Sequence, residues 1–232
     1  MWLWLIFFSL TAAAQAATVS GRVELVNSKD ASVRRHKAYA GVVVWLEPVN
    51  GAAPAARPRH VSIMQKDKRF SPHVTAIPVG STVSFPNYDP VFHNAFSNFD
   101  GQPFDVGLYP PGTSRSVTFT RPGIVRVFCN IHSTMSAIIA VLPSPWFAVT
   151  EDLGTFTIPN VPPGDYDFRV IHERALPDKL KAIARRISVS EDGLVLPLIS
   201  ISEAGYIPAA HLNKYGRQYP PVDDSVYLGG RQ

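Results

Sequence analysis

The sequence has one cysteine in 232 residues, and this scarcity excludes several kinds of protein. A single thiol cannot form an internal disulfide, a four-cysteine zinc site or the Cys-x-x-Cys-His motif of haem attachment. The sequence also lacks a phosphate-binding glycine loop and a serine nucleophile elbow. Charged residues make up only 17% of the chain, and no dense Lys/Arg run accompanies the formal charge of +4, so we expect no nucleic-acid partner.

Long apolar runs are scarce as well, and the one near the N-terminus predicts export. Residues 2–10 form an apolar run that is too short to span a bilayer. The small-x-small form of a cleavage site follows at Ala14-Gln15-Ala16, so we predict a signal peptide over residues 1–17. Because no Lys or Arg precedes the run, retention of this segment as an anchor is the alternative. No later segment is apolar enough to cross a membrane, so we expect no integral span after removal of the signal.

The rest of the chain predicts an all-β protein. Short β-branched and aromatic runs recur between Gly and Pro turns, and hydrophobic residues make up 46% of the sequence, as in globular β-sandwiches. Two Pro-rich linkers, 51–58 and 143–145, interrupt the series. We expect a loop over 27–37 and a strand over 91–97. At most two helical turns are expected, over 179–186.

The single cysteine stands in a spacing typical of a metal site. Cys129 is followed three positions later by His132, and Met135 comes three positions after that. His93 lies on an earlier predicted strand, and neighbouring strands could bring it to the same end of a sandwich. A thiolate, two imidazoles and a weak axial thioether are the ligands of a blue-copper site. The pattern therefore predicts copper held by His93, Cys129, His132 and Met135.

Two alternatives to copper remain at this stage. A lone cysteine is often a buried, inert residue, although in an exported protein a free thiol is a liability that a bound metal removes. Zinc also takes Cys and His, but methionine is a soft ligand that suits copper better. The remaining histidines show no matching spacing, and we interpret them as surface or hydrogen-bonded residues: His36, His60, His73, His172 and His211.

Residues next to the predicted ligands have candidate supporting roles. Asn94 and Asn130 each follow a ligand and could tie the two ligand segments together, or they could be ordinary turn residues. Phe92, Ile131 and Pro86 could form an apolar rim around an exposed His132, where a redox partner would dock, or they could simply be core.

The block around this motif resembles the cupredoxins, specifically the plastocyanin/amicyanin branch. The short Cys-x-x-His-x-x-Met loop is similar to that of amicyanins. The resemblance implies one type 1 copper ion, one-electron transfer, a periplasmic setting and His132 as the exposed electron port. Phe128 and Asn130 flank the cysteine where multicopper oxidases and nitrite reductases have histidine, so the resemblance argues against a self-contained oxidase. The motifs that carry the resemblance are Ile77-Pro78-Val79-Gly80-Ser81-Thr82-Val83, Phe85-Pro86-Asn87, His93-Asn94, Pro122-Gly123 and Cys129-Asn130-Ile131-His132-Ser133-Thr134-Met135.

The flanking segments resemble a prealbumin-like module of the carboxypeptidase regulatory type. This implies a cupredoxin domain over 57–143, inserted into a discontinuous sandwich formed by 18–50 plus 146–200. The tail, 201–232, has no periodicity and is predicted to be extended or disordered. The motifs are Val19-Ser20-Gly21-Arg22-Val23, Ala40-Gly41-Val42-Val43-Val44, Thr150-Glu151-Asp152-Leu153-Gly154-Thr155-Phe156 and Val161-Pro162-Pro163-Gly164-Asp165-Tyr166.

The hypothesis from sequence is an exported blue-copper protein that carries single electrons and is not an enzyme. Its partner would be a redox protein, either a c-type cytochrome or a periplasmic dehydrogenase, and an acidic partner would suit the basic chain. Copper trafficking and a structural envelope role without electron transfer are the alternatives.

Overall fold

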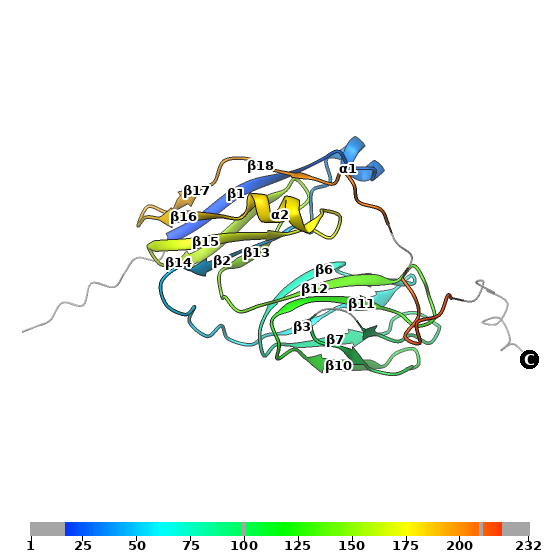
Figure 1. Cartoon of the computed structure of the whole chain (residues 1–232). Coiled ribbons are helices and arrows are strands. Elements are labelled where there is room, and N and C mark those ends of the chain that lie inside the picture. The colour runs from blue at the N-terminus through cyan, green and yellow to red at the C-terminus, as the bar shows by residue number, and fades with distance from the viewer. Residues whose placement is uncertain (1–16, 99–100, 209–210, 220–232) are drawn as a thin grey trace, which may run out of the picture.

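The computed structural model describes residues 17–98, 101–208 and 211–219 and shows two β-sandwiches, one above the other (Figure 1). Strands dominate because most segments alternate apolar and polar residues with period two, which buries one face of a strand. In the described residues, helix is confined to α1 (Ala31–His36) and α2 (Pro177–Ile183). The predicted all-β class is confirmed.

The upper sandwich in Figure 1 is built from both ends of the chain. One sheet has the order β14-β1-β17, with β18 also pairing with β1, and the other has the order β13-β2-β15-β16. The strands are β1 (Ala17–Val26), β2 (Val43–Pro48), β13 (Phe147–Val149), β14 (Thr155–Val161), β15 (Gly164–Ile171), β16 (Arg185–Val189), β17 (Leu194–Val195) and β18 (Ile199–Ser202).

Early and late strands of this sandwich are hydrogen-bonded neighbours. β1 runs antiparallel to β14, with Gly21 opposite Phe156, and β2 runs antiparallel to β15, with Leu46 opposite Phe168. Leu46, Phe156 and Phe168 are buried in one shared core. The segments before and after residues 57–143 are therefore paired in the same sheets and share a core, so the two N-terminal strands have their partners late in the chain.

The lower sandwich contains the predicted metal ligands. Its sheets have the orders β10-β7-β3 and β6-β12-β11-β8-β9, and β4 and β5 form a separate hairpin. The strands are β3 (His60–Ser62), β4 (Met64–Lys66), β5 (Arg69–Ser71), β6 (Val74–Pro78), β7 (Thr82–Pro86), β8 (Phe96–Ser97), β9 (Phe104–Asp105), β10 (Ser114–Thr118), β11 (Gly123–Phe128) and β12 (Ser136–Leu142).

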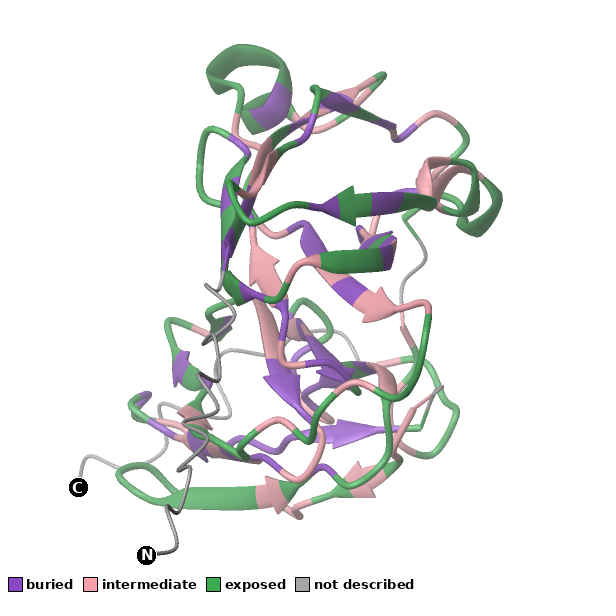
Figure 2. Ribbon diagram, turned by 90° about the vertical axis from the view of Figure 1, so that its left-hand side faces the viewer, coloured by how far each residue is buried: buried purple, intermediate pink, exposed green. Residues whose placement is uncertain are grey.

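A third apolar cluster joins the two sandwiches. Val43 of the upper sandwich is buried with Ala140 and Leu142 of the lower one, and Val74 and Ile171 pack against them. Figure 2 shows buried and partly buried residues in the strands on both sides of the waist between the two halves. The two sandwiches therefore share an apolar contact in addition to their linkers.

One predicted loop contains a helix. Within 27–37, α1 spans Ala31–His36, and Asp30 caps it by accepting a hydrogen bond from the Ser32 backbone N–H at 2.8 Å. Val33 is the buried residue of this helix. Six residues are too few to show helical periodicity, so the Asp cap was the available sequence signal.

The predicted strand over 91–97 is mostly irregular. Only β8, at Phe96–Ser97, is strand there, and His93 makes an isolated antiparallel bridge with Tyr109. Side chains compete for the backbone in this region, since Asn87 Nδ2 donates to the Val91 carbonyl at 2.8 Å. His93 thus lies in the loop between β7 and β8, and the bridge to Tyr109 fixes its position.

The predicted tail begins inside a strand. β18 pairs in parallel with β1 and alternates buried Ile199 and Ile201 with serines, a four-residue signal too short to recognise from sequence alone. Residues 211–219 have no regular structure, yet they pack against the lower sandwich, as described below. Residues 220–232 and the predicted signal peptide up to residue 16 lie outside the described residues, and Ala17 already belongs to β1. None of the helices described has the length and apolar character needed to cross a bilayer.

Candidate metal centre

Cys129 and His132 lie in a closed loop between two paired strands. β11 ends at Phe128 and β12 begins at Ser136, so the loop lies at the end of two neighbouring inner strands of the sheet. Two backbone hydrogen bonds close it: the Cys129 N–H donates to the Met135 carbonyl, and the Met135 N–H donates to the His132 carbonyl, both at 3.2 Å. This closure turns the first and fourth residues of the loop toward each other.

His93 reaches the same point from another part of the sandwich. Its backbone exchanges two hydrogen bonds with Tyr109, of 3.2 and 2.9 Å. Its Nδ1 lies 3.9 Å from Cys129 Sγ, and His132 Nδ1 lies 3.7 Å from the same sulfur. The three ligating atoms lie within 4.8 Å of one another, and all three residues are buried. The structure therefore brings three of the four predicted ligands together.

A hydrogen bond fixes which nitrogen of His93 can bind a metal. His93 Nε2 lies 2.7 Å from the Asp89 carboxylate, which accepts hydrogen bonds when ionised. Nε2 therefore carries the proton, and Nδ1 presents its lone pair toward Cys129. Asp89 is held in turn by the backbone N–H groups of Asp67 and Lys68, at 2.6 and 2.9 Å. Sequence analysis missed this carboxylate, which is the usual partner of a metal-binding histidine.

Burial sets the protonation states of the site. It lowers the pKa of His93 despite the opposing Asp89 carboxylate, and so favours the neutral imidazole that ligates metals. Burial also raises the pKa of the Cys129 thiol. A bound cation is then what would stabilise the thiolate, because a coordinating thiol loses its proton to the metal.

Met135 is fully buried beside the same loop. It belongs to one apolar cluster with Cys129 and the partly buried Ile131. Its backbone closes the loop, as described above, so the residue is fixed at the end of the Cys129–Met135 segment. The structure therefore keeps the fourth predicted ligand in the immediate neighbourhood of the other three.

The two asparagines predicted as supports do connect the ligand segments. Asn94 Oδ1 accepts from the Asn130 backbone N–H at 3.2 Å, and Asn94 Nδ2 donates to Asp105 Oδ1 at 2.7 Å. Asn130 Oδ1 in turn accepts from the Lys214 backbone N–H at 3.0 Å. The residues after both ligands are thereby tied to each other and to the C-terminal segment.

His132 is not the exposed residue that the resemblance implied. Only 5% of it is accessible, and its ring lies edge-on to that of His93 with centroids 4.9 Å apart. Residues 211–219, called here the C-terminal segment, pack against the same loop, at the Cys129 carbonyl and the Asn130 side chain. The expectation of a solvent-exposed His132 is wrong for this chain.

Three side chains anchor the C-terminal segment on this loop and on the ends of β11 and β9. Tyr219 Oη donates to the Cys129 carbonyl at 2.6 Å, and His211 Nδ1 lies 3.1 Å from the same phenol oxygen. The His211 ring stacks on Phe128 at 4.1 Å between centroids, and Lys214 Nζ lies 2.7 Å from Asp105 Oδ2. These contacts bridge about 90 residues of sequence, so no local pattern could predict them.

The predicted apolar rim is partly present. Phe92 is 47% exposed, whereas Ile131 and Pro86 are partly buried and contribute to packing. Tyr88 and Leu108, which the sequence analysis did not select, are 62% and 57% exposed. Phe92 and Leu108 each adjoin one member of the His93–Tyr109 bridge, so two exposed apolar residues lie next to the segments that position His93.

The donor set fits copper. Ligands at about 2.3 Å (sulfur) and about 2.0 Å (nitrogen) from one ion are separated by roughly 3.6–3.8 Å at tetrahedral to trigonal angles. Of the two observed sulfur–nitrogen distances, 3.7 Å lies within that range and 3.9 Å lies just above it. One thiolate with two imidazoles and a nearby thioether suits copper better than zinc, for which methionine is a poor ligand.

The other five histidines stay apart from this centre. His36 and His60 are exposed, as expected of surface residues. His73, His172 and His211 have defined partners: Glu173, Glu203 and Tyr219 respectively. Within the described part of the chain, the group of His93, Cys129 and His132 is the one cluster of such side chains close enough to share a metal.

Comparison with known proteins gives structural neighbours that are copper proteins. A purple cupredoxin from Nitrosopumilus maritimus is 24% identical over 35% of this chain and 99% of its own, with a TM-score of 0.33. A mutant of amicyanin in its Cu(I) form is 17% identical over 36% of this chain and 82% of its own, with a TM-score of 0.34. A Cu-containing nitrite reductase from Thermus scotoductus is 27% identical over 52% of this chain but only 28% of its own, with a TM-score of 0.34. No protein-family model and no curated protein matches the sequence.

Proposed function

We propose that this protein is an exported blue-copper electron carrier. The observation that carries the proposal is the convergence of Cys129 Sγ with Nδ1 of His93 and Nδ1 of His132, in a buried site where Asp89 fixes the His93 tautomer. Cys129, His93, His132 and Met135 would hold the ion, and bound copper supplies a one-electron Cu(II)/Cu(I) couple.

The protein's own contribution is a rigid and dry set of ligands. His93 is oriented by Asp89, which two backbone N–H groups hold, and the Cys129 loop is closed by its own hydrogen bonds. Burial of all three side chains excludes water from the ligating atoms. Ligands that move little between two oxidation states favour fast transfer of a single electron.

A carrier role fits this site better than catalysis. A catalytic metal needs an open position for substrate, whereas His93 and Cys129 are completely buried and His132 nearly so. We therefore propose a protein that is not an enzyme, although one structural neighbour is named as a nitrite reductase.

The proposed partner is another redox protein of the periplasm. Tyr88, Phe92 and Leu108 are exposed apolar side chains around the His93 segment, which suits a small and transient contact. The net charge of +4 favours an acidic partner, such as a c-type cytochrome or a dehydrogenase. Periplasmic location rests on the predicted signal peptide at 1–17.

The test is copper loading of the purified protein. We expect one Cu(II) per chain, with the intense visible absorption of a copper–thiolate bond that disappears on reduction and in Cys129→Ser. Absence of that absorption at full copper occupancy would rule out a blue-copper site. Electron self-exchange by NMR line broadening then separates the roles, because a carrier exchanges electrons rapidly, whereas slow exchange would favour copper trafficking.

A further inference from the structure

Lys214 of the C-terminal segment is bonded to the lower sandwich through its side chain and through both of its backbone groups. Its ammonium Nζ lies 2.7 Å from Asp105 Oδ2, and its backbone N–H donates to Asn130 Oδ1 at 3.0 Å. Its carbonyl accepts from Asn98 Nδ2 at 3.2 Å. Its side chain is only 23% exposed, whereas lysine side chains mostly lie in water. Lys214 is therefore a fixed part of this end of the sandwich.

Two of these bonds complete a ring of hydrogen bonds at the metal-binding end. Asp105, which accepts from Lys214, also accepts from Asn94 Nδ2 at 2.7 Å. Asn94 Oδ1 accepts from the Asn130 backbone N–H at 3.2 Å, and Asn130 Oδ1 accepts from Lys214. The two asparagines directly follow the first histidine ligand and the cysteine ligand. The ring therefore links the two backbone segments that present these ligands.

The ring bears on the spacing of two ligands that come from different parts of the chain. His93 Nδ1 and Cys129 Sγ lie 3.9 Å apart. The direct bond between the asparagines that follow them is neutral and 3.2 Å long. The path through Lys214 contains two bonds to a carboxylate, both of 2.7 Å, and such charged bonds are roughly twice as strong as neutral ones. The stronger of the two links between the ligand segments thus passes through Lys214.

We propose that Lys214 is a positioning residue of the copper centre, which holds the His93 and Cys129 segments at a fixed separation through Asp105 and Asn130. The inference rests on the proposed function, because it assigns the C-terminal segment a role toward bound copper. It goes beyond anchoring of that segment, since an anchor alone would leave the ligand geometry to the strands.

The sign of the change in copper affinity separates positioning from charge. A lysine ammonium repels a bound copper ion, so removal of its charge alone would tighten copper binding. Loss of a positioning bond weakens it instead. We expect Lys214→Met, which keeps an apolar stem, to lower Cu(II) affinity about fivefold in competition with a chelator, because the ion pair is partly exposed. Unchanged or tighter binding would overturn the proposal.

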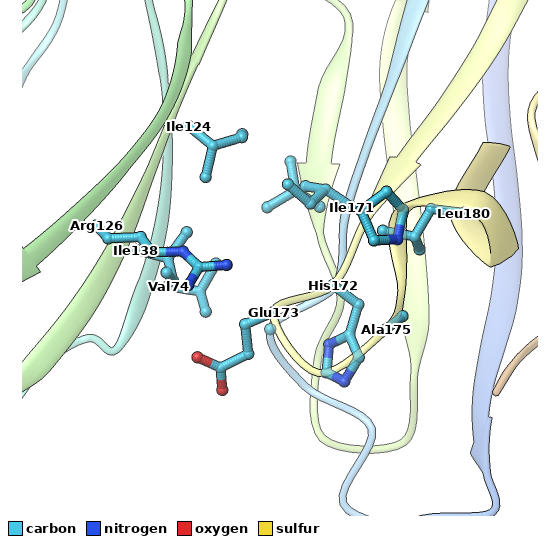
Figure 3. A pocket seen from close by; sticks show the side chains of 12 residues that line it. Val74, Ile124, Arg126, Ile138, Ile171, His172, Glu173, Ala175 and Leu180 are labelled. Atoms are coloured by element: carbon cyan, nitrogen blue, oxygen red, sulfur yellow. The ribbon is translucent and has the colours of Figure 1, made fainter. Parts of the chain in front are cut away.

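Two control variants remove a positive charge elsewhere. Arg217→Met alters an exposed cation of the same segment. Arg126→Met alters β11 three residues before Cys129, but that side chain lines a cavity of about 210 Å³ between the two sandwiches (Figure 3). Neither should lower copper affinity, and Lys214→Arg, which can still donate to Asp105, should restore most of it. An equal loss in Arg217→Met and Lys214→Met would make the effect one of general charge and the assignment wrong.

Two further measurements read the geometry directly. The EPR hyperfine splitting of bound Cu(II), which depends on ligand geometry, should change in Lys214→Met and not in Arg217→Met. In the copper-free protein, the Asn130 backbone N–H should exchange its hydrogen about fivefold faster in Lys214→Met, whereas amides in the middle of β11 and β12 keep their rates. Weaker copper binding with unchanged Asn130 exchange would overturn the ring. Faster exchange in a protein that takes up no copper would instead refute the proposed function, and the role toward copper with it.

Discussion

At the scale of single residues, the bond between Asp89 and His93 has the clearest consequence. Asp89→Asn removes the negative charge that holds the Nε2 proton, and it also disturbs the hydrogen bonds that Asp89 accepts from two backbone N–H groups. We expect copper affinity to fall by about 10–100-fold, the usual effect of losing such a partner. Competition with a chelator of known affinity measures it.

A matched control for this change is Asp192→Asn, which alters an exposed aspartate in the turn after β16. It should leave copper affinity at the wild-type value. Wild-type affinity in Asp89→Asn as well would show that the histidine is oriented by packing alone.

Sequence predicted the ligands better than their supports. Cys129, His132 and Met135 are recognisable because a loop fixes their spacing, and His93 because it is paired with a following asparagine. Asp89 is four residues before His93, but Pro90 intervenes and the segment is no helix, so spacing alone does not imply a contact. The burial of His132 was missed because the spacing of the loop residues does not show how deeply the loop lies in the fold.

At the scale of elements, the turn before β14 is fixed by a glycine. Gly154 has φ +79°, and a Cβ there would lie 2.0 Å from the Val23 carbonyl oxygen of β1. Gly154→Ala should therefore destabilise the upper sandwich by more than the roughly 1–2 kcal/mol that a positive φ costs a non-glycine residue. Chemical denaturation with the midpoint read by fluorescence measures the loss.

Gly51→Ala separates the cost of the positive φ from the cost of the steric clash. Gly51 has nearly the same φ, +84°, but nothing lies within 4 Å of the position that its Cβ would occupy. It should show only the conformational cost. Equal losses in the two variants would mean that β1 yields to the added methyl group.

The C-terminal segment makes a second prediction at this scale. Tyr219→Phe removes the hydroxyl that donates to the Cys129 carbonyl, a bond worth about 1 kcal/mol. The segment should open more often, by roughly fivefold, which limited proteolysis under fast opening conditions reports as faster cleavage. Tyr215→Phe, at a tyrosine that is 70% exposed, is the control and should not change the rate. Cleavage at one rate in both variants would assign the docking to Lys214 and His211.

Regular strands were predictable where alternation lasts five residues or more, as in β1, β7 and β11. The elements that were missed are short or depend on distant partners: α1 has one turn and a cap, and β18 has two buried isoleucines. Their formation is decided by packing on β1 and its neighbours rather than by local propensity.

At the scale of the whole molecule, one ion pair links the two sandwiches in a pH-dependent way. His73 Nδ1 lies 2.9 Å from the Ser136 carbonyl and Nε2 lies 2.8 Å from Glu173 Oε2, so both nitrogens face acceptors. Only the imidazolium can donate both bonds. The hydrogen bond with Glu173 raises the pKa of His73. Burial alone would raise the pKa of Glu173, but the His73 bond together with the charges of His73 and Arg174 lowers it.

The directions of these two pKa shifts define the pH range in which the ion pair stabilises the fold. His73 contributes stability that is complete below its unfolded pKa and is lost as pH rises through the folded value. Glu173 contributes stability that is complete above its unfolded pKa and is lost as pH falls through the folded value. His73→Gln should therefore lower the melting temperature at about pH 6 and have less effect at about pH 9. His60→Gln, at an exposed histidine of the same sandwich, should have no such pH dependence; an effect of His73→Gln that is constant with pH would contradict the imidazolium assignment.

The nested arrangement of the chain also orders its folding in time. All strands of the lower sandwich are complete by residue 142, whereas β1 and β2 must wait for β14 and β15. The backbone N–H of Thr82 donates to the Arg59 carbonyl, and that of Val79 donates to the Leu142 carbonyl. The first and last residues of the lower sandwich therefore lie close together once it has folded. Once the lower sandwich is folded, the two halves of the upper sandwich are joined by a short connection instead of a flexible loop of about 95 residues, which lowers the entropic cost of bringing them together. During synthesis, the lower sandwich would thus fold first and hold the early strands of the upper sandwich near the place where their late partners arrive.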